Sequence, residues 1–69
     1  MTNTQERKRI QQLILESYNG TSGKNVYLVT SAGKVRVCNV RVSKFRLQIQ
    51  SLNTGEWITV RFGDTIIEQ

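Results

Sequence analysis

Histidine is absent from this 69-residue chain, cysteine occurs once, and there are only five carboxylates. Without histidine a Ser-His or Cys-His nucleophile pair is impossible, and Cys38 alone forms no disulfide within the chain. Structural zinc sites use several Cys or His ligands, so we expect neither a metal nor a cofactor. Glu56, Asp64 and Glu68 show no pairing suited to acid–base catalysis, and we interpret them as solvated surface carboxylates. The protein is therefore predicted not to be an enzyme.

Long apolar runs are missing as well. The stretch from Ile10 to Leu15 is interrupted by Gln11 and Gln12, so it is not typical of a signal peptide. It is also shorter than the roughly 20 apolar residues that a membrane span requires. We therefore expect a soluble, cytoplasmic protein with no membrane partner. A chain of this length forms one domain with a marginal core, and self-association is the support that remains once disulfides and metals are excluded.

Acidic residues are absent from a long internal segment. No Asp or Glu occurs between Ser17 and Gly55, and the net charge of the chain is +5. The cations of this segment are Lys24, Lys34, Arg36, Arg41, Lys44 and Arg46. A field of one sign attracts phosphate backbones, which favours a nucleic-acid partner. The alternative interpretation is that basic residues on strand edges prevent edge-to-edge aggregation.

Residues 1–19 are predicted to form a helix. Four apolar residues recur at helical spacing, namely Ile10, Leu13, Ile14 and Tyr18. Asn3 or Thr4 can cap the start, with Glu6 in the first turn, and Asn19-Gly20 supplies the left-handed residue that ends the helix. We expect Tyr18 and Tyr27 to pack the helix against the first strand.

Residues 25–69 change to a hydrophobic period of two, which predicts five short strands. The expected strands cover 26–30, 35–42, 45–50, 56–62 and 65–68. The alternation slips by one residue near Cys38-Asn39, which predicts a β-bulge that bends the second strand sharply. The pattern is typical of a mainly β fold, in which an N-terminal α-helix precedes a small, strongly bent, five-stranded antiparallel barrel that is closed or nearly closed.

Phe45 has two interpretations. It lies between Lys44 and Arg46 at a turn, where a base stacked on the ring gains roughly 1–3 kcal/mol and the cations hold the phosphate. Alternatively, Phe45 opens the third strand and faces the core with Leu47 and Ile49, and strand alternation by itself favours this second interpretation. Trp57 and Phe62 are expected on opposite faces of the fourth strand.

The segment 58–67 (ITVRFGDTII) resembles the second motif of the Sm-like family, an apolar strand ending in Ile-Arg-Gly, then Asp or Asn, then a short apolar strand. Phe62 is an extra residue within that motif. Tyr27-Leu28-Val29 before a glycine turn is similar to the first strand of the bacterial Sm-like proteins of the Hfq type. Ser43-Lys44-Phe45 is similar to the loop where the family places Asp, a polar residue and an aromatic. Cys38 stands near the position of a family glycine, which indicates a divergent member of bacterial or phage origin.

The resemblance implies a single Sm-like domain over 1–69 that binds single-stranded, U- or A-rich RNA without catalysis. It implies a homo-oligomeric ring in which strand four of one subunit pairs with strand five of the next. The implied RNA-binding residues are Ser43, Lys44, Phe45, Arg61, Gly63 and Asp64. In this scheme Phe45 or Arg61 stacks on bases, Lys44 contacts phosphates and Ser43 forms a hydrogen bond.

Two other functions stay open. In the first, the chain is an SH3-like barrel that acts as a protein-interaction or assembly subunit. In the second, it is a small basic barrel that binds duplex DNA. The sequence also leaves open whether Arg7-Lys8-Arg9 is a second RNA contact or a solvated helix face. A continuous strand over residues 56–68, without a break at Gly63, would favour the protein-interaction subunit.

Overall fold

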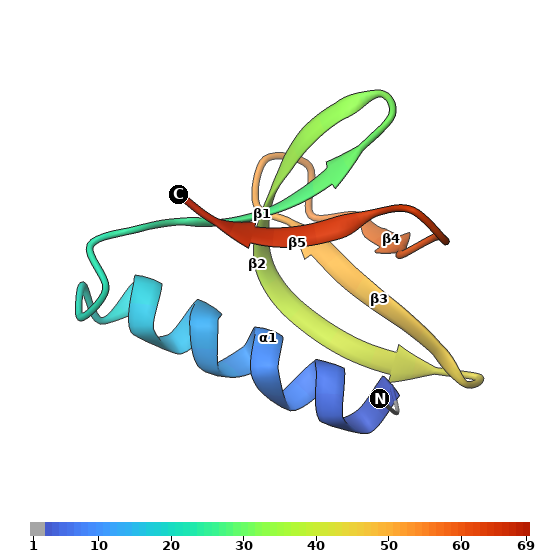
Figure 1. Ribbon diagram of the computed structural model, residues 1–69, viewed down its shortest axis with the longest axis horizontal. Helices are drawn as coiled ribbons and strands as arrows, with labels where there is room; N and C mark the ends of the chain where they lie inside the picture. Colours follow the sequence, from blue (N-terminus) through green and yellow to red (C-terminus); the bar gives the residue numbers. More distant parts are fainter. Residues whose placement is uncertain (1–2) are drawn as a thin grey trace.

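The computed structural model describes residues 3–69 as one helix followed by five strands (Figure 1). In chain order these are α1 (Asn3–Tyr18), β1 (Val26–Thr30), β2 (Gly33–Ser43), β3 (Arg46–Ser51), β4 (Trp57–Thr59) and β5 (Thr65–Glu68). The predicted class, mainly β with an N-terminal helix, is confirmed. The first two positions of the predicted helix lie outside the described residues.

Helix α1 packs mainly against β2 and is anchored by Ile10, which is fully buried. Its end is as predicted, because Gly20 adopts a left-handed φ of 72° and the Asn19 and Gly20 amides donate back to Leu15 and Ser17. The expectation for Tyr18 is wrong. Tyr18 is 88% exposed, so it does not pack the helix against β1.

The strands form one sheet of order β4-β3-β2-β1-β5, in which all neighbours are antiparallel. The first part of β2, residues 33–36, pairs with β1, and the rest pairs with β3. The register shifts between Val37 and Asn39, which confirms the predicted β-bulge at Cys38. Figure 1 shows the resulting strong curvature of β2, which lets the two parts of the sheet enclose a core.

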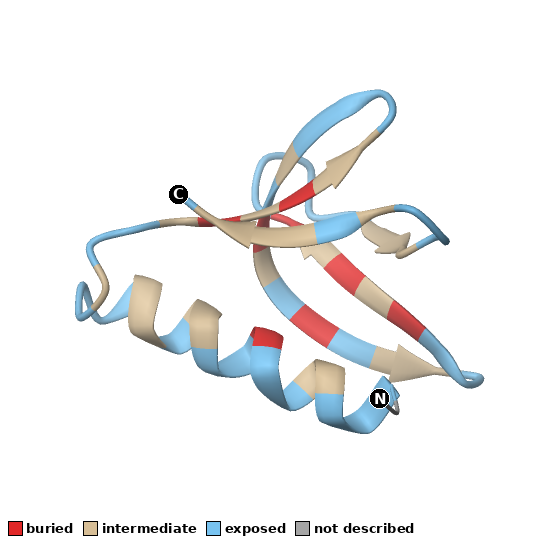
Figure 2. Ribbon diagram, viewed as in Figure 1, coloured by how far each residue is buried: buried red, intermediate tan, exposed pale blue. Residues whose placement is uncertain are grey.

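The core lies between α1 and the concave side of this bent sheet (Figure 2). Its buried apolar members are Ile10, Val26, Leu28, Val37, Val40, Leu47 and Ile49. On β3 the buried residues Leu47 and Ile49 alternate with Gln48 and Gln50, as the hydrophobic period predicts. One face of β3 therefore lies in the core and the other lies at the surface.

The two ends of the sheet differ from the sequence prediction. Within residues 3–69, β4 and β5 have no strand beyond them, so the sheet is not closed and the nearly closed barrel stays a prediction. Strand β4 is also shorter than the expected strand 56–62. The Val60 amide still donates to the Leu47 carbonyl oxygen, and the chain then enters a turn at Arg61. No helix in the described part of the chain has the length and apolar character needed to cross a membrane.

Candidate nucleic-acid interface

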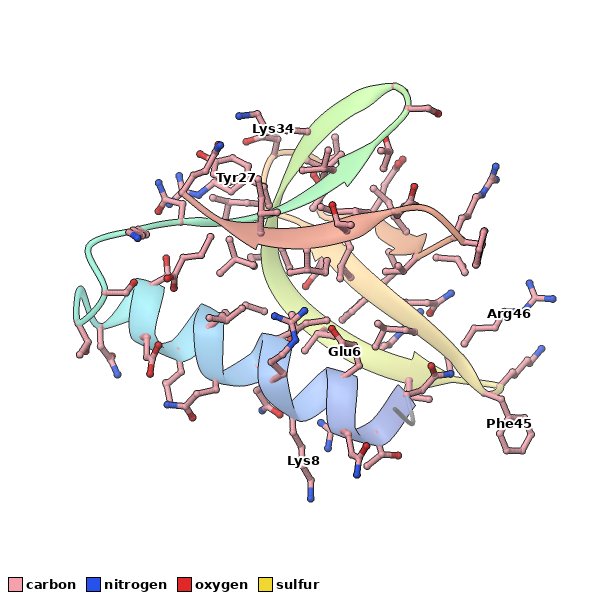
Figure 3. The ribbon with its side chains drawn as sticks, in the orientation of Figure 1. Glu6, Lys8, Tyr27, Lys34, Phe45 and Arg46 are labelled. Atoms are coloured by element: carbon pink, nitrogen blue, oxygen red, sulfur yellow. The ribbon has the colours of Figure 1, made fainter. Side chains whose placement is uncertain are left out.

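The turn between β2 and β3 presents Phe45 to solvent. Lys44 and Phe45 are its two central residues, and both have left-handed backbone angles, with φ of 51° and 65°. These backbone angles give the twist that a two-residue hairpin needs, and Asn-Gly is the pair usually found there. For a residue other than glycine, the left-handed conformation costs about 1–2 kcal/mol. The Phe45 side chain is 93% exposed and extends away from the molecule (Figure 3). The core-facing interpretation of Phe45 is therefore wrong, because the turn removes it from the alternation of β3.

The turn between β4 and β5 is held by Asp64. The Arg61 amide donates to Asp64 Oδ2 at 3.0 Å, and the Asp64 amide donates to the Arg61 carbonyl oxygen at 3.0 Å. Gly63 has a φ of 93°, which favours glycine. Phe62 is fully exposed at the tip of this turn. The geometry gives Gly63 and Asp64 a role in shaping the turn, and their contact with RNA stays a prediction.

The two turns border one open groove with a volume of about 440 Å³. Its lining residues are Asn3, Phe45, Arg46, Leu47, Thr59, Val60, Arg61 and Phe62. The structure thus brings together Phe45 and Arg61, which the sequence analysis proposed from separate segments. The side-chain amide of Asn3 donates to the Phe45 carbonyl oxygen, so the start of α1 supports the hairpin tip. The residues that line the groove thus include two exposed phenylalanines and two arginines.

Ser43 and Lys44 lie on another surface. They line a hollow together with Arg41, Arg46, Gln48 and Thr59, on the side of the β2–β3–β4 sheet that faces away from the core. Arg46 borders both this hollow and the groove. Of the predicted site residues, Phe45 and Arg61 therefore line the groove, and Ser43 and Lys44 line the adjacent hollow. Gly63 and Asp64 line neither of these two surfaces.

Phe62 and the Arg41–Trp57 pair are further candidates that the sequence did not indicate. The Arg41 guanidinium carbon lies 4.1 Å from the centre of the Trp57 ring. Arg41 Nε donates to Gln48 Oε1 at 2.9 Å, and Gln48 Nε2 donates to Thr59 Oγ1 at 3.1 Å. Strand parity alone does not indicate this cluster, because it depends on the register, which pairs Arg41 with Gln48 and Gln48 with Thr59.

The cations of the hairpin have no carboxylate partners in the described part of the chain, where the single ion pair joins Arg9 to Glu6. On α1, Arg7 Nη1 also donates to Gln11 Oε1 at 3.2 Å, whereas Lys8 is exposed (Figure 3). The arrangement therefore concentrates uncompensated positive charge around the β2–β3 turn.

Residues 3–69 contain no group of three or more His, Cys, Asp or Glu side chains placed to hold a metal ion. No family model matches the chain, and no curated protein or solved structure matches it significantly.

Proposed function

We propose that this protein binds single-stranded RNA without catalysis, as a homo-oligomeric ring of Sm-like subunits. The observation that carries the proposal is the groove in which Phe45 and Phe62 lie exposed beside Arg46 and Arg61. Two exposed rings permit base stacking, and adjacent cations neutralise phosphates.

The left-handed backbone conformation of Phe45 supports a binding role for its aromatic ring. A bulky residue at left-handed φ is strained, and strain of this kind concentrates at binding and active sites. The Phe45 side chain contributes almost no burial to the fold, since it is 93% exposed. A ligand that covers the ring explains why an aromatic residue occupies a turn position that glycine fits better.

Unpaired bases are the ligand that this groove fits. A base inside a duplex already stacks on its neighbours, whereas a single strand leaves its bases free to stack on Phe45 or Phe62. The resemblance of residues 58–67 to the Sm-like motif favours RNA, and U- or A-rich RNA in particular. The break that this motif requires is present, because β4 ends at Thr59 and β5 begins at Thr65. In this proposal Lys44 contacts phosphate and Ser43 forms a hydrogen bond at the hairpin tip.

The two free edges of the sheet support assembly into a ring. Hydrogen bonds between β3 and β4 alternate, with Val60 N bonded to Leu47 O and Ser51 N bonded to Glu56 O, so the backbone groups of Trp57 and Thr59 point outward. At the other edge, Asn25 and Gln69 exchange two backbone hydrogen bonds. The same alternation along β5 therefore leaves the backbone N–H and C=O groups of Ile66 and Glu68 pointing away from β1. Two short edges with matched free donors and acceptors suit the pairing of β4 of one subunit with β5 of the next. This pairing would close the barrel across the interface.

The test is fluorescence anisotropy with labelled oligo-U and oligo-A on wild type, Phe45→Ala, Arg61→Ala and Tyr18→Ala. Phe45→Ala should weaken binding roughly 5- to 150-fold, because one stacked base contributes about 1–3 kcal/mol. Tyr18→Ala is the matched control, since it removes an equally exposed ring from the opposite end of α1 and should leave affinity unchanged.

Unchanged affinity in both Phe45→Ala and Arg61→Ala would overturn the assignment of the groove. Tighter binding to a duplex than to either oligonucleotide would support the small DNA-binding barrel instead. A wild-type protein that binds no nucleic acid would support the protein-interaction subunit.

A further inference from the structure

We infer that the outward face of β2, β3 and β4 is a second contact surface for the same RNA strand. In this inference Arg41, whose guanidinium lies over the Trp57 ring, stacks on a base of the strand that lies beyond the groove. The inference rests on the proposed function, because it extends the path of a strand that first occupies the groove.

The composition of this face is the first argument. The register places the outward residues in rows across the three strands. These residues are Asn39, Arg41, Ser43, Arg46, Gln48, Gln50, Trp57 and Thr59. These eight residues include no carboxylate, and the half-buried Trp57 ring is the one large apolar group among them. A face with cations, amides, hydroxyls and a single ring is complementary to phosphates and bases, and it does not suit an apolar protein partner.

The fixed position of Arg41 is the second argument. Its guanidinium lies 4.1 Å from the centre of the Trp57 ring, and Gln48 accepts its Nε hydrogen bond at 2.9 Å. Gln48 is fixed in turn by its bond to Thr59 Oγ1. Arg41 is nevertheless exposed, so its side chain is accessible to a ligand. Bases stack on Arg guanidinium planes in single-stranded RNA complexes, and a plane that is already oriented loses less freedom on binding.

Continuity with the groove is the third argument. Arg46 borders both the groove and the hollow on this face, and Lys44 lies at the turn between them. Neither cation pairs with a carboxylate within residues 3–69. A strand that leaves Phe45 and passes around the hairpin tip therefore meets Arg46 and Lys44 before it reaches Arg41.

The competing explanation is that the Arg41–Trp57 pair only covers the short edge strand β4. The two explanations differ in their dependence on RNA length. If the face binds RNA, Arg41 matters for a strand of about 16 nucleotides and not for one of about 4, which are the limits of the usual site size of a small β-barrel module. A purely structural pair gives the same effect at both lengths.

The experiment compares labelled oligo-U of these two lengths on wild type, Arg41→Lys and Phe45→Ala. Arg41→Lys keeps the charge and removes the stacking plane, so it should weaken binding of the long strand at least about fivefold and leave the short strand unchanged. Phe45→Ala should weaken both lengths, because both occupy the groove. Trp57 is the only tryptophan in the chain, so its fluorescence reports directly on this face. The long strand should quench that fluorescence in wild type, and the short strand should not.

Equal effects of Arg41→Lys at both lengths, or Trp57 fluorescence that the long strand leaves unchanged, would overturn the inference. The proposed function would still stand if Phe45→Ala weakened both lengths in that experiment. Conversely, quenching of Trp57 together with full affinity of Phe45→Ala would support the outer face and overturn the groove. Equal quenching by duplex DNA would overturn the assignment to a single strand.

Discussion

Lys44 and Phe45 adopt a backbone conformation that stabilises the hairpin twist but does not suit their side chains. With φ of 51° and 65°, both have a Cβ close to the following carbonyl oxygen. The exposed ring recovers almost none of this cost through burial. Stability and binding should therefore oppose one another at Phe45.

Phe45→Gly should raise the free energy of unfolding by up to about 1 kcal/mol, because glycine adopts this φ without strain. For a domain of this size that change raises Tm by about 4–8 °C. The same variant should bind RNA more weakly, because it lacks the aromatic ring. Thermal unfolding followed by circular dichroism checks stability, and anisotropy checks binding.

Phe45→Ala is the control for that substitution, since it removes the ring and keeps a Cβ at the strained position. It should lose affinity without gaining stability. A Phe45→Gly variant less stable than Phe45→Ala would contradict the role given to backbone strain.

At the scale of elements, α1 depends on few contacts with the sheet. Ile10 is its one buried residue in the described range, and Leu13 and Ile14 pack beside it only partly buried. Asn3 then holds the hairpin tip through the Phe45 carbonyl oxygen. The helix is therefore attached at its middle by burial and at its start by a hydrogen bond near the groove.

Ile10→Ala should lower the free energy of unfolding by about 2–5 kcal/mol, through lost burial and the cavity left behind. Ile10→Val should cost only about 0.5–1.5 kcal/mol. Urea denaturation of the two variants and wild type measures the difference. Similar midpoints for Ile10→Ala and wild type would show that α1 contributes little to the fold.

The elements also show what the sequence can predict. Strands β1 and β5 and the bulge at Cys38 were predictable, because the alternation of side chains and its slip are visible in the order of residues. The length of β4 was not, since the turn after it depends on a hydrogen bond between the Arg61 amide and Asp64. For Phe45, strand alternation by itself favoured a position in β3 over the turn, whereas Lys44 and Phe45 form the two-residue turn before that strand.

The groove and the outer face could not be predicted at all from local pattern. Phe45 and Arg61 become neighbours only because β3 and β4 pair beside the hairpin tip. The Arg41–Trp57 contact likewise joins two strands that flank β3. Contacts of this kind depend on the register of the whole sheet, and a period of two along each strand does not give that register.

At the scale of the whole molecule, the net charge of +5 acts through a few uncompensated cations. If Lys44, Arg46 and Arg61 each meet one phosphate of a short RNA, log Kobs should fall with log salt at a slope of about −2, since a single strand releases about 0.7 counterions per contact. Lys44→Ala should reduce the magnitude of that slope by about 0.7. Anisotropy titrations over a series of salt concentrations measure it.

Lys8→Ala is the matched control, since Lys8 is an exposed lysine on α1. A slope unchanged by this variant would support the interpretation of Arg7-Lys8-Arg9 as a solvated helix face. A reduced slope would instead support a second RNA contact on the helix. Equal slopes for Lys44→Ala and wild type would remove Lys44 from the site.

Assembly is the property in which the open edges of the sheet have the greatest consequence. The outward N–H of Thr59 donates to no strand within the described fold, and proline is tolerated at such an edge position because no internal ladder bond is lost. Thr59→Pro should therefore fold but fail to pair with a neighbouring β5, which would leave a monomer. Thr59→Ala removes the hydroxyl bonded to Gln48 and keeps the N–H, so it should assemble like wild type. Light scattering gives the mass of each variant, and circular dichroism checks the fold.

The contrast between these two variants separates backbone pairing from side-chain effects. A multi-subunit wild type, a monomeric Thr59→Pro and a multi-subunit Thr59→Ala would together identify β4 as the interface. A Thr59→Pro variant of wild-type mass would exclude the β4 edge, and a monomeric wild type would overturn the ring itself. RNA binding by a monomer would then have to come from one groove and one outer face, without the gain in avidity that repeated sites provide.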